Sequence, residues 1–208
     1  MKITALLVAF ISFTLAAVAQ PSTKQTHMKQ ALLIVDIQND YFPGGNHTLV
    51  GANEAAQQAK KVLANFRKKG LPVIHIRHIA TNEGATFFLP DTPGAAINEA
   101  VLPLPGEKVI TKHYPNSFRE TDLQAYLKAN DLQQLTILGM MTHVCIDATV
   151  KAAKDNGYDC TVVADACATL DVTIQGKQVP ADDVQHALLA AMAFYYADIK
   201  TAAAVMAE

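Results

Sequence analysis

Short runs of consecutive apolar residues, separated by longer stretches with helical periodicity, constrain the fold of this chain more than any other feature. The first run, residues 31–35, is continuous rather than alternating, a pattern that is typical of strands buried on both faces of a parallel sheet. Comparable runs predict further strands at residues 71–79, 109–110, 135–138, 161–164 and 199–202.

Helical patterns fill the intervals between these strands. We expect helices over residues 53–69, from a capping box at residues 121–124, over residues 146–156 and after Pro180. The alternation predicts an α/β fold with three layers, a Rossmann-like parallel six-stranded sheet with helices on both faces, in a single domain. The buried face of the last helix is predicted to consist of Val184, Ala187, Leu188, Ala191 and Phe194.

The composition limits the kinds of molecule that this chain is expected to bind. The chain has 208 residues and a formal net charge of −2, so it is long enough for one α/β domain and lacks the basic excess of a nucleic-acid-binding protein. Its 3 cysteines are too few for a disulfide scaffold or a multi-cysteine zinc module. We therefore expect a small-molecule substrate and no nucleic-acid partner.

An apolar segment precedes the domain. Residues 1–19 carry a single charge near their start and end in the small-x-small pattern Ala-Val-Ala, which predicts a secretory signal peptide cut after Ala19. Residues 20–29 are polar and predict a linker before a domain at residues 30–208. The mature protein is then expected in the periplasm or outside the cell, with no membrane association after cleavage. The alternative is translation from Met28, which predicts a cytoplasmic protein.

Ligands of such sheets bind beyond the carboxyl ends of the strands, so the residues that end the apolar runs are the candidates for chemistry. Asp36 ends the first run, Lys112 follows a later one, and Cys145 stands at the start of the third predicted helix. A helix start favours a thiolate, and its amides can hold an oxyanion. Taken singly, the three residues also fit a loop carboxylate, a solvated lysine and a small buried cysteine; Cys160 and Cys167 are interpreted as core residues.

Three segments containing these residues resemble the isochorismatase-like cysteine hydrolases, a superfamily that includes nicotinamidases and N-carbamoylsarcosine amidases. They read Leu-Ile-Val-Asp-Ile-Gln-Asn-Asp at residues 33–40, Lys-His-Tyr-Pro-Asn-Ser-Phe at 112–118 and Gly-Met-Met-Thr-His-Val-Cys at 139–145. The resemblance extends from Ala31 to about Ala203 and identifies the predicted domain as a hydrolase domain.

The resemblance implies a catalytic triad of Asp36, Lys112 and Cys145. It also implies a cis peptide bond between Met140 and Met141, an oxyanion hole made by the Met141 and Cys145 amides, and a homo-oligomer. In this scheme Asp36 is the general base, Lys112 lowers the pKa of the thiol, and Cys145 forms a thioester. The predicted reaction is hydrolysis of a C–N bond in an amide, a lactam or a carbamoyl group.

Residues 84–90, 112–118 and 145–149 further resemble the branch that contains streptothricin hydrolase, which opens a cyclic amide. Two alternatives remain open: an exported thiol-based binding or redox-sensing protein, and a catalytically inactive family member. The complete triad, and the lack of a resolving cysteine near Cys145 in the sequence, favour the hydrolase.

No metal ion or cofactor is expected. Nicotinamidases carry an Asp-x-His element after their second strand as part of a metal site, whereas the matching residues 75–84 contain His75 and His78 without that element. His75 is interpreted as a packed strand residue, and His78 as a strand-end residue that lines the pocket.

Residues near the strand ends are candidate substrate contacts. Phe88, Phe118 and His143 are further candidates, although aromatic residues equally suit a core or a subunit interface. Asp40 is interpreted as a loop carboxylate that caps neighbouring amides. The candidate substrate-binding residues are Gln38, Phe42, His78, Phe87, Tyr114 and Asn116.

Overall fold

The computed structural model describes residues 29–208. The predicted signal peptide, residues 1–19, and the predicted linker up to residue 28 lie outside the described residues, so both stay predictions. Lys29 already belongs to the first strand, which therefore begins before the apolar run at residues 31–35. Across residues 29–208, no helix is both long enough and apolar enough to cross a membrane.

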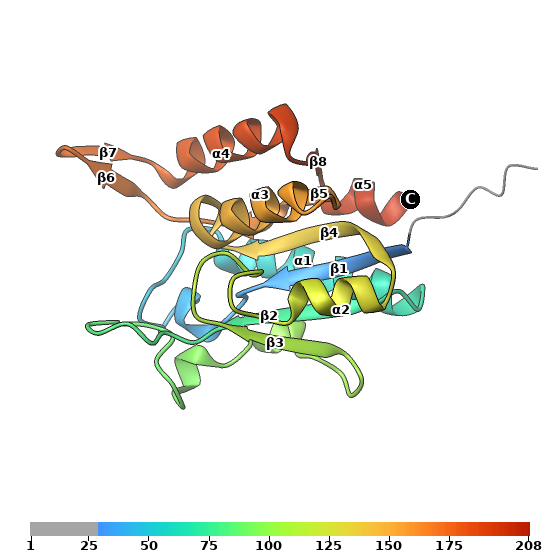
Figure 1. Cartoon of the computed structure of the whole chain (residues 1–208). Helices are drawn as coiled ribbons and strands as arrows, with labels where there is room; N and C mark the ends of the chain where they lie inside the picture. Colours follow the sequence, from blue (N-terminus) through green and yellow to red (C-terminus); the bar gives the residue numbers. More distant parts are fainter. Residues whose placement is uncertain (1–28) are drawn as a thin grey trace, which may run out of the picture.

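A parallel six-stranded sheet forms the centre of the molecule, with the strand order β3-β2-β1-β4-β5-β8 (Figure 1). This confirms the predicted sheet. The order reverses at β1, because β2 lies on one side of it and β4 on the other, and such switch points are where open α/β sheets bind ligands. The strands are β1 (Lys29–Val35), β2 (Val73–His78), β3 (Lys108–Lys112), β4 (Leu132–Met140), β5 (Asp159–Ala168) and β8 (Asp198–Lys200).

Helices cover both faces of the sheet, which confirms the three-layer arrangement (Figure 1). One face is covered by α1 (Ala52–Lys68) and α5 (Ala202–Ala207). The other is covered by α2 (Leu123–Ala129), α3 (Asp147–Asp155) and α4 (Ala181–Tyr195).

The side chains of β1 alternate between two hydrophobic cores. Leu32 and Ile34 pack in the core under α1, whereas Leu33 and Val35 pack in the core under α2 and α3. All four side chains are at most 2% exposed. The strand therefore has no solvated face, which explains why its sequence is a continuous apolar run.

The predicted buried face of α4 is wrong in part. Val184 is buried as expected and Leu188 is half-buried, but Ala187, Ala191 and Phe194 are exposed, with Phe194 92% accessible. The helix lies over the edge of the sheet, where β8 is only 3 residues long, so little surface is available beneath it.

Three local features also differ from the predicted pattern. The capping box at residues 121–124 does not form, because Thr121 Oγ1 accepts from the Leu123 N–H instead of the Gln124 N–H and the Gln124 side chain donates to Asn156. The last strand ends at Lys200 because Thr201 caps α5. The sequence pattern also does not predict the hairpin formed by β6 (Val172–Ile174) and β7 (Lys177–Val179).

Candidate active site

Three segments bring Asp36, Lys112 and Cys145 together at the carboxyl edge of the sheet. Asp36 follows β1, Lys112 is the last residue of β3, and Cys145 lies in a π-helical turn (Thr142–Ile146) between β4 and α3. The Asp36 and Lys112 side chains are fully buried, and Cys145 is 3% exposed. Residues 33 to 109 positions apart in the sequence thus share one water-poor site.

Two backbone features shape the strand ends beneath this site. Gly139 pairs with Val35 across the sheet, has a φ of 133°, and would place a Cβ 1.9 Å from the Val35 carbonyl oxygen. A larger residue is therefore excluded there. Asp36 has a φ of 50°, in the left-handed region that residues other than glycine adopt infrequently. The chain turns sharply at this point, immediately after β1.

The Lys112 ammonium is the centre of the site. Its Nζ lies 2.7 Å from Asp36 Oδ2, 3.2 Å from Cys145 Sγ, 3.0 Å from the Tyr114 carbonyl oxygen and 3.1 Å from His78 Nδ1. An ammonium carries three N–H bonds, so these acceptors compete for its protons. A fixed positive charge consequently lies between the carboxylate and the sulfur.

The protonation of the resting site follows from burial and from these charges. Burial raises the pKa of the Cys145 thiol, the negative charge of Asp36 raises it further, and Lys112 opposes both without overcoming them. Burial lowers the pKa of Lys112, but the charges of Asp36 and Cys145 outweigh burial and raise it. The resting site is therefore an Asp36–Lys112 ion pair beside a neutral thiol.

Lys112 lowers the thiol pKa, as predicted, but by less than burial and Asp36 raise it, so Cys145 is not a thiolate in the resting site. The ammonium is paired with a carboxylate at 2.7 Å, so little of its charge is left to stabilise a thiolate in buried surroundings. Any chemistry that uses Cys145 as a nucleophile would therefore need a base to remove the thiol proton.

His78, at the end of β2, is a neutral hydrogen-bond donor. Burial and then the charge of Lys112 lower its pKa to about 4. Because an ammonium can only donate, His78 Nδ1 must accept from Lys112 and the proton must reside on Nε2. Nε2 has no hydrogen-bond partner among residues 29–208, so its N–H is available to a ligand.

Asp36, His78 and Cys145 each offer one atom that could bind a metal ion, and these atoms lie within 4.8 Å of one another. However, all three also lie within contact of Lys112 Nζ. The lysine ammonium thus supplies the cation that this donor set would otherwise attract, and a divalent ion would be repelled by it. The expectation of no metal stays a prediction, supported by this arrangement.

The peptide bond between Met140 and Met141 is cis, the geometry that the resemblance implies. The π-helical turn follows directly, and within it the Met141 carbonyl accepts hydrogen bonds of 3.1 Å from the amides of Val144 and Ile146. Met141 and Cys145 both line a cavity at this edge of the sheet. Their backbones therefore border the cavity, as an oxyanion hole made by these two amides would require.

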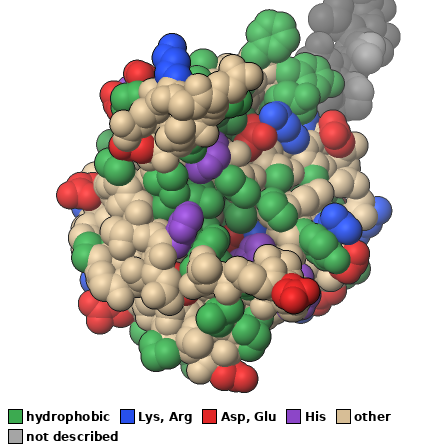
Figure 2. All heavy atoms as spheres, turned by 90° about the vertical axis from the view of Figure 1, so that its left-hand side faces the viewer, with side chains coloured by type: hydrophobic (Ala, Val, Ile, Leu, Met, Phe, Trp, Pro, Cys, Tyr) green, Lys and Arg blue, Asp and Glu red, His purple; other side chains and the backbone are tan. Residues whose placement is uncertain are grey.

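A cavity of about 400 Å³ opens onto Cys145. Figure 2 looks onto this edge of the sheet and shows a hollow of apolar side chains, in green, with histidine side chains, in purple, around it. Tyr41 and Phe88 meet edge to face, with ring centroids 4.7 Å apart. The apolar walls are formed mainly by Tyr41, Ala85, Phe87, Phe88, Met141 and Val144.

Of the predicted substrate contacts, His78 and Phe87 line this cavity. Gln38 does not, because its amide is used within the protein: Nε2 donates to the carbonyls of His78 and Ala95, and Oε1 accepts from the His78 N–H. Gln38 therefore positions His78 instead of reaching the cavity. Phe42 is 8% exposed and belongs to the hydrophobic core under α1, also away from the cavity.

Tyr114 and Asn116 also lie outside the cavity lining. Tyr114 contributes its carbonyl to Lys112, and its ring lies 3.6 Å from the Arg119 guanidinium. Asn116 Oδ1 accepts from the Phe118 N–H and stabilises the turn after β3. The sequence motif marks the correct segment here, but the side chains in it face other directions.

Four further residues were interpreted from the sequence, and they differ in whether they reach the cavity. His75 is a buried strand residue, as predicted, with Nε2 2.9 Å from Glu107. Phe118 packs in the core, and His143 contacts Thr169. Phe88, by contrast, lines the cavity.

Sequence reasoning did not single out Tyr41 and Val144, which line the cavity. It did recognise Asp40 as a carboxylate that caps amides, and the structure shows which ones. Asp40 is 1% exposed and accepts from the amides of Phe88, at 2.6 Å, and Asn46, at 3.1 Å. Asp40 thereby fixes the backbone of Phe88, which belongs to the aromatic wall of the cavity.

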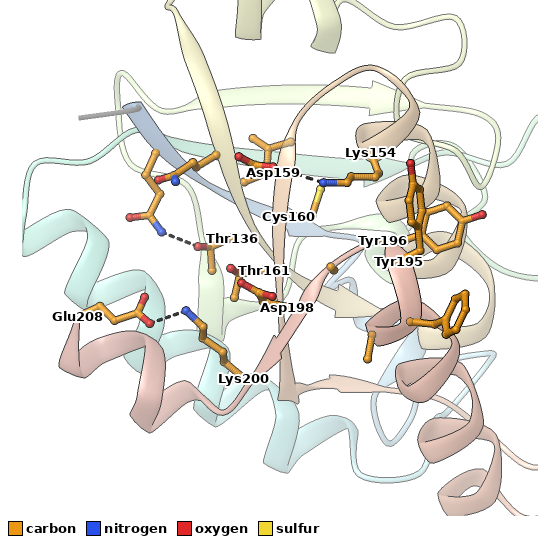
Figure 3. A pocket seen from close by; sticks show the side chains of 16 residues that line it. Thr136, Lys154, Asp159, Cys160, Thr161, Tyr195, Tyr196, Asp198, Lys200 and Glu208 are labelled. Atoms are coloured by element: carbon orange, nitrogen blue, oxygen red, sulfur yellow. Dashed lines mark hydrogen bonds and ion pairs between the residues drawn. The ribbon is translucent and has the colours of Figure 1, made fainter. Parts of the chain in front are cut away.

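A second hollow, of about 480 Å³, lies at the opposite, amino edge of the sheet (Figure 3). Four of its charged side chains are paired with one another: Lys154 bonds to Asp159, and Lys200 to Glu208. Cys160 lies in its wall, whereas Asp36, Lys112 and Cys145 do not contribute to it. The chemistry of the molecule is therefore expected at the carboxyl edge.

Comparison with known proteins agrees with this geometry. The family model described as the isochorismatase domain matches residues 30–203. The uncharacterized isochorismatase family protein YddQ of Bacillus subtilis strain 168 is 49% identical over 179 residues, which cover 86% of this chain and 99% of YddQ. A streptothricin hydrolase of Streptomyces noursei is 32% identical and matches 69% of this chain and 51% of its own length.

A solved structure is similar over nearly the same range. The crystal structure of a protein from Oleispira antarctica, described as an isochorismatase hydrolase, superposes with a TM-score of 0.84 at 48% sequence identity. The match covers 88% of this chain and 98% of that protein. Sequence and fold thus point to the same set of relatives.

Proposed function

The chain belongs to the isochorismatase family, and on this premise we propose that it is a cysteine hydrolase that cleaves a C–N bond of a small molecule. The bond belongs to an amide, a lactam or a carbamoyl group. One observation carries the proposal: the buried Lys112 ammonium contacts both Asp36 and Cys145 at the floor of an open cavity.

In the first half of the reaction, Cys145 Sγ attacks the carbonyl carbon while Asp36 takes the thiol proton. The S–C bond forms and the carbonyl π electrons move to the oxygen, which the Met141 and Cys145 amides stabilise. Because the thiol pKa is raised, proton transfer accompanies the attack instead of preceding it. Asp36 then donates this proton to the leaving nitrogen, and the C–N bond breaks to give an amine and a thioester.

In the second half, water attacks the thioester carbon and gives a proton to Asp36. The C–S bond breaks, and the sulfur recovers the proton from Asp36, which restores the resting site. Lys112 stays protonated throughout and holds Asp36 in place at 2.7 Å. Water is the single co-substrate that this scheme consumes.

The structure lends less support to the two alternatives. A redox sensor needs a solvent-accessible thiolate, whereas Cys145 is 3% exposed and burial raises its pKa. An inactive family member would need a blocked or incomplete site, whereas the cavity reaches Cys145 and the three side chains are in contact.

The experiment is a screen of purified protein against amides, N-carbamoyl amino acids and lactams, with the released amine as the readout. Cys145→Ala and Asp36→Ala are each expected to lower kcat by at least about 10³-fold. Cys160→Ala is the matched control, since this buried cysteine lies at the amino edge and should leave kcat unchanged. Turnover retained in Cys145→Ala, with the fold verified by circular dichroism, would refute the mechanism.

We also propose that residues 1–19 direct export of the chain. The support is the sequence pattern alone, which ends in Ala-Val-Ala at residues 17–19. Cell fractionation followed by N-terminal sequencing should give a mature protein beginning at Gln20. A cytoplasmic protein that begins at Met1 or Met28 would contradict export.

A further inference from the structure

We propose that the cavity above Cys145 selects uncharged amides with an apolar acyl group and discriminates against acyl groups that carry a carboxylate. This inference rests on the proposed function, because it names the substrate class of the same site. It is carried by the walls of the cavity, by the charges around it and by a neutral donor, the Nε2–H of His78, beside the thiol.

The walls are apolar and come from separate segments. Tyr41 follows β1, Phe87 and Phe88 lie in the loop after β2, and Val144 lies in the turn before α3. Phe87 and Phe88 also meet each other edge to face, with ring centroids 4.9 Å apart. Such surfaces bind apolar groups by removing them from water.

The charges near the cavity do not favour an anion. The described residues that line it include no lysine, arginine, aspartate or glutamate. The nearest cation, Lys112, is fully buried and already paired with Asp36. A carboxylate in the cavity would therefore lose its hydration without gaining a cationic partner, and it would approach the negative charge of Asp36.

His78, His47 and His143 supply no positive charge to the cavity at neutral pH. His78 accepts from Lys112 through Nδ1 and is neutral. Burial also lowers the pKa values of His47 and His143, which lie close to the cavity mouth. At the cavity itself, His113 Nδ1 donates to the Ile79 carbonyl.

The Nε2–H of His78 adds a single polar requirement. It is a neutral donor beside the thiol, and a ring nitrogen, an ether or a second carbonyl of the substrate can accept from it. A neutral donor stabilises such an acceptor without the strong preference for a carboxylate that an arginine would show. The site thus combines apolar walls with an uncharged hydrogen-bond donor next to the thiol.

The test compares two amides that differ in one charge. Benzamide and 4-carbamoylbenzoate share the ring and the scissile amide, and only the second carries a carboxylate. The kcat/KM for benzamide should be higher by at least about tenfold, because only the second must bury an unpaired charge. An equal value, or a preference for the carboxylate, would overturn the inference.

A second readout does not depend on turnover. Iodoacetamide and iodoacetate both alkylate a thiol with loss of iodide, and only iodoacetate is charged. Intact-protein mass spectrometry gives the rate of each at Cys145, and the ratio is normalised to the ratio measured with glutathione. We expect the normalised ratio to favour iodoacetamide by about tenfold or more.

The two readouts separate failure of the inference from failure of the proposed function. Selective labelling without hydrolysis of any amide contradicts the proposed function and supports the charge selectivity. Hydrolysis of both amides at equal rates contradicts the inference alone. Labelling by neither reagent would contradict an open route from the cavity to Cys145, and with it the inference.

A charge placed at the cavity rim should reverse part of the selectivity. Thr86 is exposed and lines the cavity, so Thr86→Lys adds a cation there without touching Asp36, Lys112 or Cys145. The ratio of the two kcat/KM values should move toward the carboxylate by about tenfold in Thr86→Lys and stay unchanged in Thr86→Gln. The same shift in both variants would indicate an effect of side-chain size and would count against the inference.

Discussion

Lys112 and Asp36 form a buried ion pair in which each charge depends on the other. Their side chains are fully buried and the contact is 2.7 Å. Replacing one partner leaves an uncompensated charge in a water-poor site. Replacing both with neutral groups leaves no unpaired charge there. In the proposed mechanism, the same two residues therefore serve both catalysis and stability.

Urea unfolding of Lys112→Met should show a loss of about 3–5 kcal/mol in the free energy of unfolding. Much of this loss should be recovered in the double variant Lys112→Met with Asp36→Asn. Lys29→Met, at the exposed ion pair with Asp131, is the control and should cost less than about 1 kcal/mol. A loss in Lys112→Met as small as that of the control would mean that the pair is not isolated from water.

His78 gives the protein a measurable pH dependence. Its pKa is about 4 in the folded protein and 6.5 in an unperturbed histidine, so the unfolded chain binds more protons between these values. The contribution of neutral His78 to stability is complete above pH 6.5 and is lost as the pH falls toward 4. A variant at residue 78 that still accepts the hydrogen bond from Lys112, but does not titrate between pH 4 and 6.5, should lack this pH dependence of stability.

His78→Asn is such a variant, because its amide oxygen can take the place of Nδ1. The difference in unfolding free energy between wild type and His78→Asn should shrink as the pH falls from 6.5 to 4. The titrations of His47, His75 and His143 occur in both proteins and cancel in the difference. A difference that stays constant over this range would contradict a neutral, Lys112-bound His78.

At the scale of elements, the close approach of β4 to β1 is what places the π-helical turn beside Asp36. Gly139 makes it possible, because any Cβ at this position would overlap the Val35 carbonyl. Gly139→Ala should therefore lower the free energy of unfolding by more than about 3 kcal/mol. Gly157→Ala is the control: its φ of 88° is also positive, but no atom lies within 4 Å of the added Cβ.

The control should cost only about 1–2 kcal/mol, from the positive φ alone. Thermal or urea unfolding of both variants gives the comparison. Equal losses in the two variants would show that the contact with Val35 relaxes easily, and that β4 does not need to lie so close to β1.

The elements differ in how far the sequence could predict them. The continuous run at residues 31–35 identifies β1 because a strand buried on both faces admits no polar residue. The face of α4 was misjudged because periodicity reveals that a helix is amphipathic or apolar, and not how much surface the neighbouring strand offers. Phe194 is apolar and follows the stripe, yet nothing covers it within the described residues.

The site shows the same limit. Asp36, Lys112 and Cys145 could be predicted because each lies at or soon after the carboxyl end of a strand, and these ends meet at one edge of a parallel sheet. Gln38 and Tyr41 follow the same strand, and only their side-chain directions separate a buried clamp from a cavity wall. These directions depend on the local turn, which residue spacing does not specify.

At the scale of the whole molecule, α4 carries an exposed apolar face. Phe194 is 92% and Tyr195 65% exposed, and both lie near its carboxyl end. An exposed apolar surface of this kind is typical of an interface, which fits the proposal of a homo-oligomer. Covering this face with a second copy would bury the aromatic rings that the single chain leaves in water.

Size-exclusion chromatography with light scattering should show an oligomer for the wild type and a smaller species for Phe194→Asp. Ile174→Asp is the control, because Ile174 is 65% exposed on the hairpin β6–β7 and lies on a different element. A monomeric wild type, or an equal effect of both substitutions, would contradict an interface centred on α4.

The most direct test of the central claim is to trap the covalent intermediate. The protein is mixed with p-nitrophenyl benzoate, quenched in acid within the first turnover, and analysed by intact mass and peptide mapping. We predict one benzoyl group on Cys145, absent from Cys145→Ala and greatly reduced in Asp36→Asn. Release of p-nitrophenol with no acyl group on Cys145, or with the group on Cys160 or Cys167, would contradict the proposed mechanism.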